Sequence, residues 1–283
     1  MDEAILLFFE KIRCPALTWV FGFISFFGEA VTIGGIVILL WWLIGGRAGE
    51  QLLFTALSSA AMNSMMKCAV HRPRPYAAGV VERLDVDTPL FTTRGLGDNL
   101  SFPSGHAQAT TSALLTGACL KHRAWKWVVA VLCILLVCCS RLYFGVHYPT
   151  DVLAGALFGT LVAIFWQLIF REGYRYRYMI LICMALFILA TVPLAPEKEL
   201  VRMAGLLAGG AFFLPLVSFL HYDGPIKSWK RLLRIPVGLL AAGSVFALTL
   251  LFPEDLGFTL LKWFLIIGAG TFLATLFFKI LRI

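Results

Sequence analysis

Charged side chains are scarce in this sequence, in which Asp, Glu, Lys and Arg together make up 14% of 283 residues. A soluble globular domain is usually about 25% charged and about 45–50% apolar, whereas this chain is 60% hydrophobic. Apolar runs of about 17–25 residues, the length that crosses a bilayer, recur almost to its C-terminus. The composition therefore excludes a soluble domain and predicts an all-α, polytopic helical membrane protein.

The sequence also lacks the patterns of a disulfide framework and of a metal site. Its seven cysteines stand singly or as the pair Cys138-Cys139, mostly inside apolar runs, which favours small core residues. No cluster of Asp and Glu near the polar motifs described below resembles a magnesium or calcium site. We therefore expect a protein that uses no metal and no cofactor.

The formal net charge of +8 needs a different explanation from nucleic-acid binding. A nucleic-acid partner would require a basic face on a soluble module, and the sequence has no such module. The excess of Lys and Arg instead fits short cytoplasmic loops, where these residues accumulate. The basic stretches, which we place in the cytoplasm, are 121–126, 171–177, 227–234 and 279–283, and the acidic ones opposite are 195–199 and 253–257.

Between these loops, the apolar runs predict nine or ten membrane spans. No cleaved signal peptide is expected, because Glu10, Lys11 and Arg13 interrupt the first run. Small residues inside the spans, such as Gly155 and Gly159, predict close helix packing. The runs are about 15–27, 30–45, 49–68, 104–120, 127–141, 150–170, 178–194, 200–220, 235–252 and 257–279.

Tryptophan is concentrated near the ends of the predicted spans. Indole rings favour the boundary between lipid and water, so these side chains predict an interfacial aromatic belt. The residues concerned are Trp19, Trp41, Trp42, Trp125, Trp127 and Trp229.

Three polar blocks collect most of the unusual residues, and the loop orientation places all three on the extracytoplasmic side. The first is KCAVHRPRP, residues 67–75, which opens a polar loop over about 71–103. The second is FPSGHA, residues 102–107, and the third is SRLYFGVHYPTD, residues 140–151. Ionisable residues so close to membrane spans are costly, which makes a functional role the default hypothesis.

The second block has the features of a helix start that binds anions. Ser104 is a favoured N-cap residue after Pro103, and Gly105 has no Cβ, so a ligand can approach the backbone closely. The first N–H groups of a helix have no internal partners and lie at the positive end of its dipole, which suits phosphate. His106 would project from the same first turn.

The third block predicts an oriented histidine. Pro149 suits the first position of a helix, so that His147 precedes the helix and Asp151 lies in its first turn. The carboxylate can then accept a hydrogen bond from Nδ1 of His147, which leaves Nε2 free to attack an electrophile. Arg141 adds a planar two-pronged donor for phosphate oxygens, and Lys67 and Arg74 supply further cations on the same side.

Together, these residues fit phosphoryl transfer through a covalent phosphohistidine. His147 would attack phosphorus in line, and His106 would protonate the leaving oxygen and then activate water. The equatorial oxygens of the phosphoryl group would be held by Lys67, Arg74, Ser104, Gly105 and Arg141.

The three blocks, in this order and spacing, resemble the signature of the type 2 phosphatidic acid phosphatases, whose superfamily includes lipid phosphate phosphatases and vanadium haloperoxidases. The resemblance implies a six-helix membrane-embedded phosphatase core within residues 1–177. It also implies a metal-independent hydrolase of a lipid phosphate or pyrophosphate in the cell membrane, with its site on the extracytoplasmic side. Phosphatidic acid, phosphatidylglycerol phosphate and undecaprenyl pyrophosphate are the candidate substrates. The resemblance does not cover residues 178–283, where about four additional spans are expected.

Other interpretations of the same residues stay open at this point. Taken singly, Arg141 fits a snorkelling interface residue and Asp151 a carboxylate stabilised by a helix dipole. Arg72 lies inside the first block and is expected at the rim of the site. The whole set also fits a lipid phosphotransferase, a phosphatase for a soluble sugar phosphate, or a non-catalytic phosphate-lipid transporter.

Overall fold

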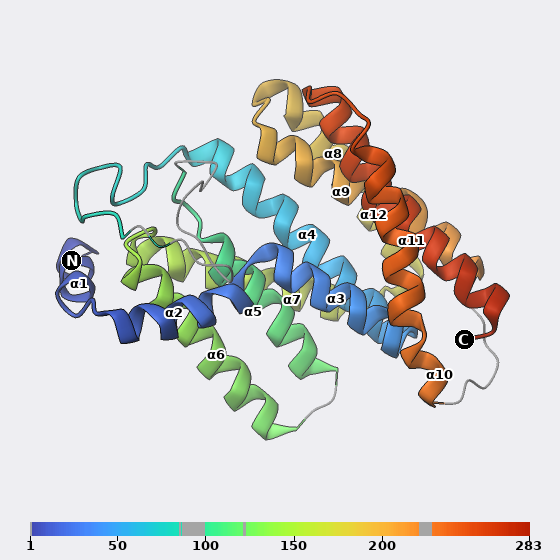
Figure 1. Ribbon diagram of the computed structural model, residues 1–283, viewed down its shortest axis with the longest axis horizontal. Coiled ribbons are helices and arrows are strands. Elements are labelled where there is room, and N and C mark those ends of the chain that lie inside the picture. Colours follow the sequence, from blue (N-terminus) through green and yellow to red (C-terminus); the bar gives the residue numbers. More distant parts are fainter. Residues whose placement is uncertain (1, 85, 87–99, 121–122, 221–227) are drawn as a thin grey trace. The chain divides into compact units, whose positions relative to one another are not determined.

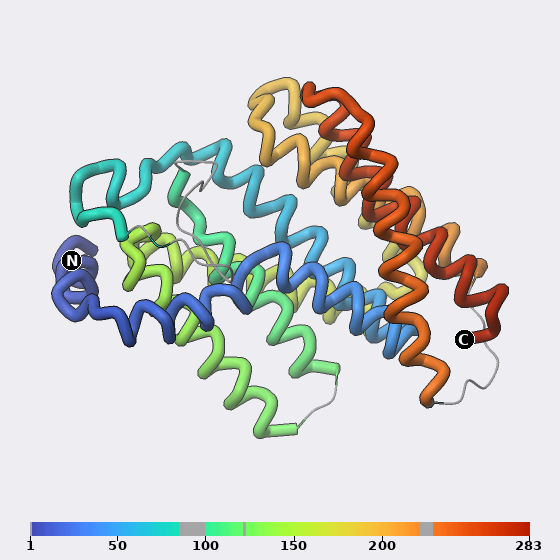
Figure 2. Tube along the Cα trace, viewed as in Figure 1, coloured from blue at the N-terminus to red at the C-terminus, as the bar shows by residue number. Residues whose placement is uncertain are grey.

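The computed structural model describes residues 2–84, 86, 100–120, 123–220 and 228–283, and these ranges contain helices and no strand (Figures 1 and 2). This confirms the predicted fold class. Part of the polar loop predicted at 71–103 lies outside the described residues. The α-helices are α1 (Asp2–Lys11), α2 (Pro15–Gly28), α3 (Ala30–Ile44), α4 (Gly46–Val70), α5 (Gly105–Cys119), α6 (Ala124–Tyr143), α7 (Pro149–Glu172), α8 (Arg177–Thr191), α9 (Lys198–Leu220), α10 (Ser228–Leu232), α11 (Arg234–Thr249) and α12 (Leu256–Leu281).

The helices cluster into two compact units, and each unit is discontinuous in sequence. The first unit comprises Met1–Ile36 and Met62–Gln167, and the second comprises Val37–Ala61 and Leu168–Ile283. This grouping differs from the single division after residue 177 that the sequence predicts, because α3, α4 and α7 each contribute residues to both units.

Within the first unit, α7 packs closely on α5 through two glycines one turn apart. A Cβ built on Gly155 would lie 2.5 Å from the carbonyl oxygen of Ser104, and one on Gly159 would lie 2.5 Å from that of Gln108. Any side chain would therefore push the two helices apart. The predicted role of these glycines is confirmed, and the packing fixes the start of α5 against α7.

Within the second unit, α9 and α12 pack on each other in the same way. A Cβ on Gly205 would lie 2.5 Å from the carbonyl oxygen of Leu260, and Gly209 faces the carbonyl oxygen of Phe264 at a closer approach still. Backbone-to-backbone contact of this kind is the usual means of association between helices in lipid, where apolar burial drives little.

Six of the described helices or helix pairs are long and apolar enough to span a membrane, and the pair α2 and α3, bent by 51°, makes a seventh if it counts as one span. The sequence predicts nine or ten. The difference arises because α5 has only 15 residues and α4 carries many polar side chains, among them the buried Gln51, Ser58 and Asn63. The four predicted C-terminal spans are all present as helices.

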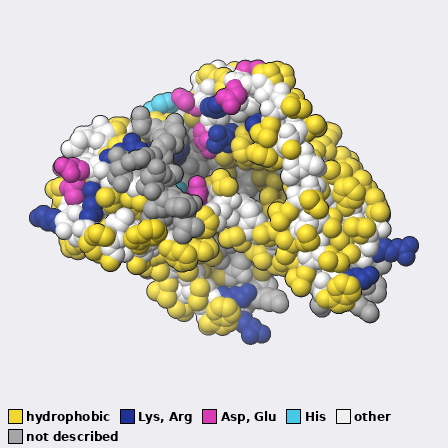
Figure 3. Space-filling view, viewed as in Figure 1, with side chains coloured by type: hydrophobic (Ala, Val, Ile, Leu, Met, Phe, Trp, Pro, Cys, Tyr) yellow, Lys and Arg dark blue, Asp and Glu magenta, His cyan; other side chains and the backbone are white. Residues whose placement is uncertain are grey.

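Apolar side chains cover much of the surface in Figure 3. On α7, for example, large hydrophobic residues three or four apart are exposed, as expected for a helix that faces lipid. They are Leu153, Leu157, Leu161, Ile164 and Leu168. The structure and its pattern of exposure are those of a multi-pass membrane protein.

Candidate active site

The chain changes direction within the first polar block, directly after α4 ends. His71 adopts a left-handed conformation with φ of 51°, which ends the helix. The chain then pairs with the segment before the second block: Pro73 and Leu100 form an antiparallel bridge, and the Ser101 N–H donates to the Arg72 carbonyl over 2.7 Å. The Lys67 ammonium donates to the Leu100 carbonyl over 3.4 Å. Two distant stretches of sequence are thereby joined.

The second block begins α5 as its residues predict. The Ser104 hydroxyl accepts a hydrogen bond from the Ala107 N–H over 3.5 Å, which confirms the N-cap. The Ser104 N–H donates to the carbonyl oxygen of Asp151 over 3.0 Å and so ties this block to the third. A Cβ on Gly105 would lie 3.2 Å from Oδ1 of Asn63, so the glycine here leaves room for that amide.

Asn63, on α4, also holds the helix start from the other side. Its Nδ2 donates to Oε1 of Gln108 over 2.8 Å and to the carbonyl oxygen of Pro103 over 3.4 Å. Both amide side chains are buried. The loop before α5 is therefore fixed by side-chain hydrogen bonds, which also fix the direction of the first turn.

The third block connects α6 to α7, and Pro149 is the first residue of α7, as predicted. Gly145 has φ of +67°, and a Cβ there would lie 2.8 Å from Nη2 of Arg13, so the turn requires glycine. Arg13 also donates from Nε to the Tyr143 carbonyl over 3.1 Å and from Nη1 to the Glu82 carbonyl over 2.9 Å. The segment after α1 thus braces the turn that carries His147.

His147 and Asp151 do not form the direct hydrogen bond that the sequence predicts. Nδ1 of His147 lies 3.7 Å from Oδ2 of Asp151, which is close for an ion pair and too long for a hydrogen bond. The Ser101 hydroxyl lies 3.5 Å from Nδ1 and makes a short hydrogen bond to the same carboxylate oxygen. Because Ser101 donates its proton to Asp151, its oxygen is left to accept from Nδ1–H of the histidine. All three side chains are buried.

Arg72 binds the carboxylate and does not act as the rim residue that the sequence suggests. Its Nη1 donates to Oδ1 of Asp151 over 2.8 Å and to the Thr150 hydroxyl over 2.7 Å. The guanidinium lies over the Tyr148 ring, 3.8 Å from its centroid, and 3.5 Å from Oδ2 of Asp2. Both oxygens of Asp151 therefore have donors, Oδ1 from Arg72 and Oδ2 from Ser101 and from the Tyr148 N–H over 2.8 Å, which holds the carboxylate ionised and in one orientation.

Two arginines among the predicted cations are buried in this unit. Arg74 donates from Nη1 to the Val146 carbonyl over 3.1 Å, which places it beside the third block. Arg141 donates from Nε to the Ser140 hydroxyl over 3.3 Å, and from Nη2 it makes a short hydrogen bond to the hydroxyl of Ser25 on α2. Sequence patterns gave no sign of Ser25, because it lies in an apolar run far from the three blocks.

The charged residues predicted for the site lie close enough together to interact electrostatically. His106 is close enough to interact electrostatically with Arg141, His147, Arg74 and Lys67, and Arg141 interacts in turn with Arg74. The structure thus brings together all eight residues that the sequence predicts for the site, at the ends of α4, α5, α6 and α7. Ser101 and Ser25 are additional residues that it reveals, and Arg72 takes a different role from the one that the sequence suggests.

The environment of His147 keeps its ring neutral. Burial, together with the nearby cations Arg74 and Lys67, lowers the pKa of His147 to about 3, although its contact with Asp151 acts in the opposite direction. At physiological pH the imidazole is therefore uncharged, which is the form in which Nε2 has a lone pair for attack.

Comparison with known proteins identifies relatives of this part of the chain. The profile of the PAP2 superfamily matches residues 48–175. An undecaprenyl-diphosphatase of Sulfolobus acidocaldarius is 28% identical over half of this chain and 65% of its own length. A decaprenylphosphoryl-5-phosphoribose phosphatase of Mycobacterium tuberculosis is 34% identical over 43% of this chain and 56% of its own length. In both cases, the match spans less than two thirds of the relative.

One solved structure is also similar. It is the crystal structure of a transmembrane PAP2 type phosphatidylglycerolphosphate phosphatase from Bacillus subtilis, which is 25% identical and has a TM-score of 0.47. The match covers 59% of this chain and 82% of that one.

Proposed function

The chain belongs to the PAP2 superfamily through residues 48–175, and we propose that it is a metal-independent membrane phosphatase that hydrolyses a lipid phosphate or pyrophosphate. The similar proteins in this superfamily are phosphatases, consistent with a phosphoric monoester hydrolase. The observation that carries the proposal is the convergence of a buried neutral His147 and a second histidine, His106, with the cations Lys67, Arg74 and Arg141.

In the first step, Nε2 of His147 attacks phosphorus in line with the leaving oxygen. An N–P bond forms as the P–O bond to the leaving group breaks, and His106, which is protonated in the complex with the anionic substrate, donates its proton to the departing oxygen. Lys67, Arg74 and Arg141, with the Ser104 hydroxyl and the Gly105 N–H at the start of α5, hold the equatorial oxygens, where negative charge concentrates.

In the second step, water hydrolyses the phosphohistidine. His106, now without its proton, takes one from the attacking water, whose oxygen bonds to phosphorus as the N–P bond breaks. Phosphate leaves, and both histidines return to their starting forms. The Arg and Lys side chains keep their charges throughout, so the same cradle serves both transition states.

Ser101 and Asp151 act on the nucleophile through its other nitrogen. Nδ1–H of His147 donates to the Ser101 hydroxyl, which donates to Asp151, so the positive charge that develops on the ring is stabilised through a hydroxyl bridge. Arg72 holds the carboxylate from its second oxygen. We assign these three residues to positioning, because none of them needs to touch the phosphate.

We place the site on the extracytoplasmic side of the cell membrane. The positive-inside orientation of the basic loops supports this side. A lipid substrate would enter laterally from the outer leaflet, with its headgroup at the three blocks. Phosphatidic acid, phosphatidylglycerol phosphate and undecaprenyl pyrophosphate remain the candidate substrates, and the activities of the two relatives named above favour an isoprenyl phosphate or pyrophosphate.

The test is phosphate release by the purified protein in detergent with EDTA, across those three lipids, sphingosine-1-phosphate and glucose-6-phosphate. We expect release from a lipid substrate without any added acceptor, and its loss in both His147→Ala and His106→Ala. The matched control is His71→Asn, because His71 is exposed and asparagine tolerates its left-handed conformation. Full activity of either alanine variant would contradict the mechanism, and release that requires an acceptor alcohol would indicate a phosphotransferase.

A further inference from the structure

Helix α1, which holds no residue of the three polar blocks, packs against the turn between α6 and α7. Leu6, 1% exposed, lies in a buried cluster with Val81 and Tyr148, and Phe9 packs against the cluster that contains Phe144. Figure 1 shows α1 at the same end of the first unit as the loop that follows α4. These apolar contacts hold the first residues of α1 beside the third block.

Asp2, the first residue of α1, contacts residues of the first and third blocks. Its Oδ2 lies 3.5 Å from Nη2 of Arg72 and accepts a hydrogen bond from the Thr150 hydroxyl over 2.8 Å. That hydroxyl in turn accepts from Nη1 of Arg72 over 2.7 Å. The same Nη1 donates to Oδ1 of Asp151 over 2.8 Å. Arg72 therefore lies between two carboxylates, one on α1 and one beside His147.

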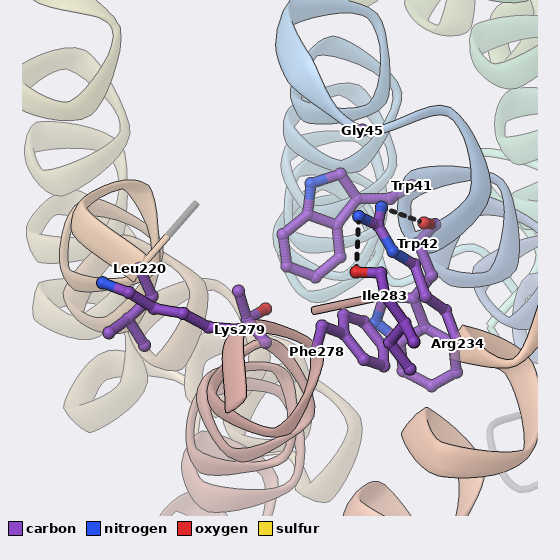
Figure 4. Close-up of a pocket in the computed structure, with 9 residues that line it drawn as sticks. Trp41, Trp42, Gly45, Leu220, Arg234, Phe278, Lys279 and Ile283 are labelled. Carbon is purple, nitrogen blue, oxygen red and sulfur yellow. Dashed lines mark hydrogen bonds between the residues drawn. The ribbon is translucent and has the colours of Figure 1, made fainter. Parts of the chain in front are cut away.

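Arg72 is held in a different way from Arg234 in the second unit. Arg234 donates to the main-chain oxygens of Trp42 and Ile283, over 2.9 Å and 3.0 Å, in the pocket shown in Figure 4. In the described part of the chain, the Arg72 guanidinium contacts side chains instead, and that of Asp2 is one of them. Side chains turn about several bonds, so the orientation of Arg72 depends on whether these partners stay in place.

We propose that Asp2 is a positioning residue for the nucleophile and acts through Arg72 and Asp151. This inference rests on the proposed function, because it gives Asp2 a part in that reaction. Asp2 keeps Nη1 of Arg72 on one oxygen of Asp151, and the other oxygen then faces Ser101 and His147. When Nε2 of His147 attacks phosphorus, the oriented carboxylate stabilises the positive charge that develops on the ring.

The exposure of the ion pair between Asp2 and Arg72 decides which kind of effect to expect. The Arg72 and Asp2 side chains are 32% and 26% exposed, and ion pairs in contact with water contribute little to stability. A change at Asp2 should therefore leave the melting temperature close to that of wild type. A loss of turnover at an unchanged melting temperature then reports the orientation of Arg72 and Asp151.

The first test is the kinetics of phosphate release by Asp2→Asn. Asparagine also caps helices, so α1 should still form. We expect kcat to fall about three- to fivefold with KM unchanged, because the pair is partly exposed and Asp2 does not touch the phosphate. The matched control is Glu3→Gln, since Glu3 is the neighbouring, exposed carboxylate of the same helical turn. Equal kcat values for the two variants would overturn the proposal.

Two further variants separate the carboxylate of Asp2 from its hydroxyl partner. Asp2→Glu keeps the negative charge and should recover part of the lost kcat. Thr150→Val removes the hydroxyl that accepts from Arg72 and donates to Asp2, so it should lower kcat in the same way as Asp2→Asn.

A double-mutant cycle tests whether Asp2 acts through Arg72. In the background of Arg72→Gln, the change Asp2→Asn should cause no further loss of kcat. An equal fall in the presence and absence of Arg72 would contradict the proposed route.

A measurement without turnover separates this inference from the proposed function. The chain has five histidines, so ¹⁵N-histidine labelling gives an NMR spectrum in which His147 is assigned by the loss of its signals in His147→Gln. We expect Asp2→Asn to shift the Nδ1 resonance of His147 and Glu3→Gln to leave it in place. An unmoved resonance in Asp2→Asn would overturn the inference, even if the wild type released no phosphate from any lipid and the proposed function failed.

Discussion

Two polar clusters of this protein contain similar residue types but differ in their balance of positive and negative charge. The His147 cluster, in the first unit, consists of Lys67, Arg72, Arg74, Ser101, His106, Arg141, His147 and Asp151. The Glu50 cluster, in the second unit, consists of Glu50, Tyr174, Arg177 and Tyr178. In the Glu50 cluster, Arg177 pairs with the carboxylate over 3.0 Å, and both phenols donate to it, Tyr174 over 3.2 Å.

This difference in charge distinguishes a cluster that stabilises the fold from one that is suited to bind an anionic substrate. Glu50 has a guanidinium and two hydroxyl donors, and Arg177 also lies over both phenol rings, so the group is neutral and closed. The His147 cluster, in contrast, holds four cations, Lys67, Arg72, Arg74 and Arg141, and one carboxylate, Asp151, and three of these cations donate hydrogen bonds to neutral carbonyl and hydroxyl oxygens. Charge balance, more than burial, distinguishes the two.

The largest effect on activity is expected from His147→Ala. Loss of the nucleophile should lower turnover by at least about 10³-fold, with a melting temperature equal to or above that of wild type, because buried catalytic groups are often held at a cost in stability. Rapid-quench labelling with a ³²P-labelled lipid phosphate should show a phosphoenzyme in wild type and none in the variant. A labelled variant would mean that another residue is the nucleophile.

The Glu50 cluster should respond in the opposite way. Glu50→Ala leaves Arg177, whose side chain is only 13% exposed, without its counter-ion. Loss of one partner of a buried pair typically costs about 3–5 kcal/mol, so the variant should melt below wild type by an amount near the lower end of that range. The activity of each folded molecule should stay close to normal, as measured at a temperature where the variant is folded. Replacement of both partners, by Glu50→Leu with Arg177→Met, should recover part of the lost stability. A fall in activity with no change in melting temperature would contradict the structural role.

A smaller effect on activity is expected from Ser101→Ala, which removes the hydroxyl between His147 and Asp151. The loss of about 1.5–3 kcal/mol for a hydrogen bond to a charged group corresponds to a fall in kcat of roughly ten- to hundredfold. KM should change little, because Ser101 does not touch the phosphate. Ser112→Ala is the matched control, since Ser112 is similarly buried and its hydroxyl donates to the nearby Ala109 carbonyl. Equal kcat values for the two variants would rule out the bridge.

The smallest effect is a pH dependence of stability that belongs to His147. Its pKa of about 3 in the folded protein lies below its ordinary value of about 6.5. Between these values the unfolded chain binds a proton that the folded chain does not, so this stability is present above pH 6.5 and is lost as the pH falls. The melting temperature of wild type should therefore fall a few degrees more between pH 7 and pH 5 than that of His147→Gln, in phosphate-free buffer.

Much of the site could be predicted because its features are local in sequence. Ser104 caps α5 and Pro149 begins α7 for reasons that lie within one helical turn. The three blocks each hold their residues at short, fixed spacing. The number of spans could not be read in the same way, because the bend of 51° between α2 and α3 and the buried polar face of α4 follow from packing.

The contacts that tune the site depend on residues brought together from far apart. Ser101 and Asp151 are separated by 50 positions and Ser25 and Arg141 by 116, and no periodicity links such pairs. Arg72 also binds a distant residue, Asp151, although its place in the first block suggested a residue at the rim of the site. Trp41 and Trp42 likewise have the sequence context of a membrane belt and the environment of a buried pocket.

By itself, the sequence determined the helical membrane class, the three blocks and the residue types that handle phosphate, because hydrophobic length, capping and motif spacing act over a few residues. Only the tertiary structure decided which oxygen faces His147, which carboxylate Arg72 binds, and which tryptophans are buried. Those outcomes depend on hydrogen-bond geometry within about an ångström, and that geometry is set by helices packed from distant parts of the chain.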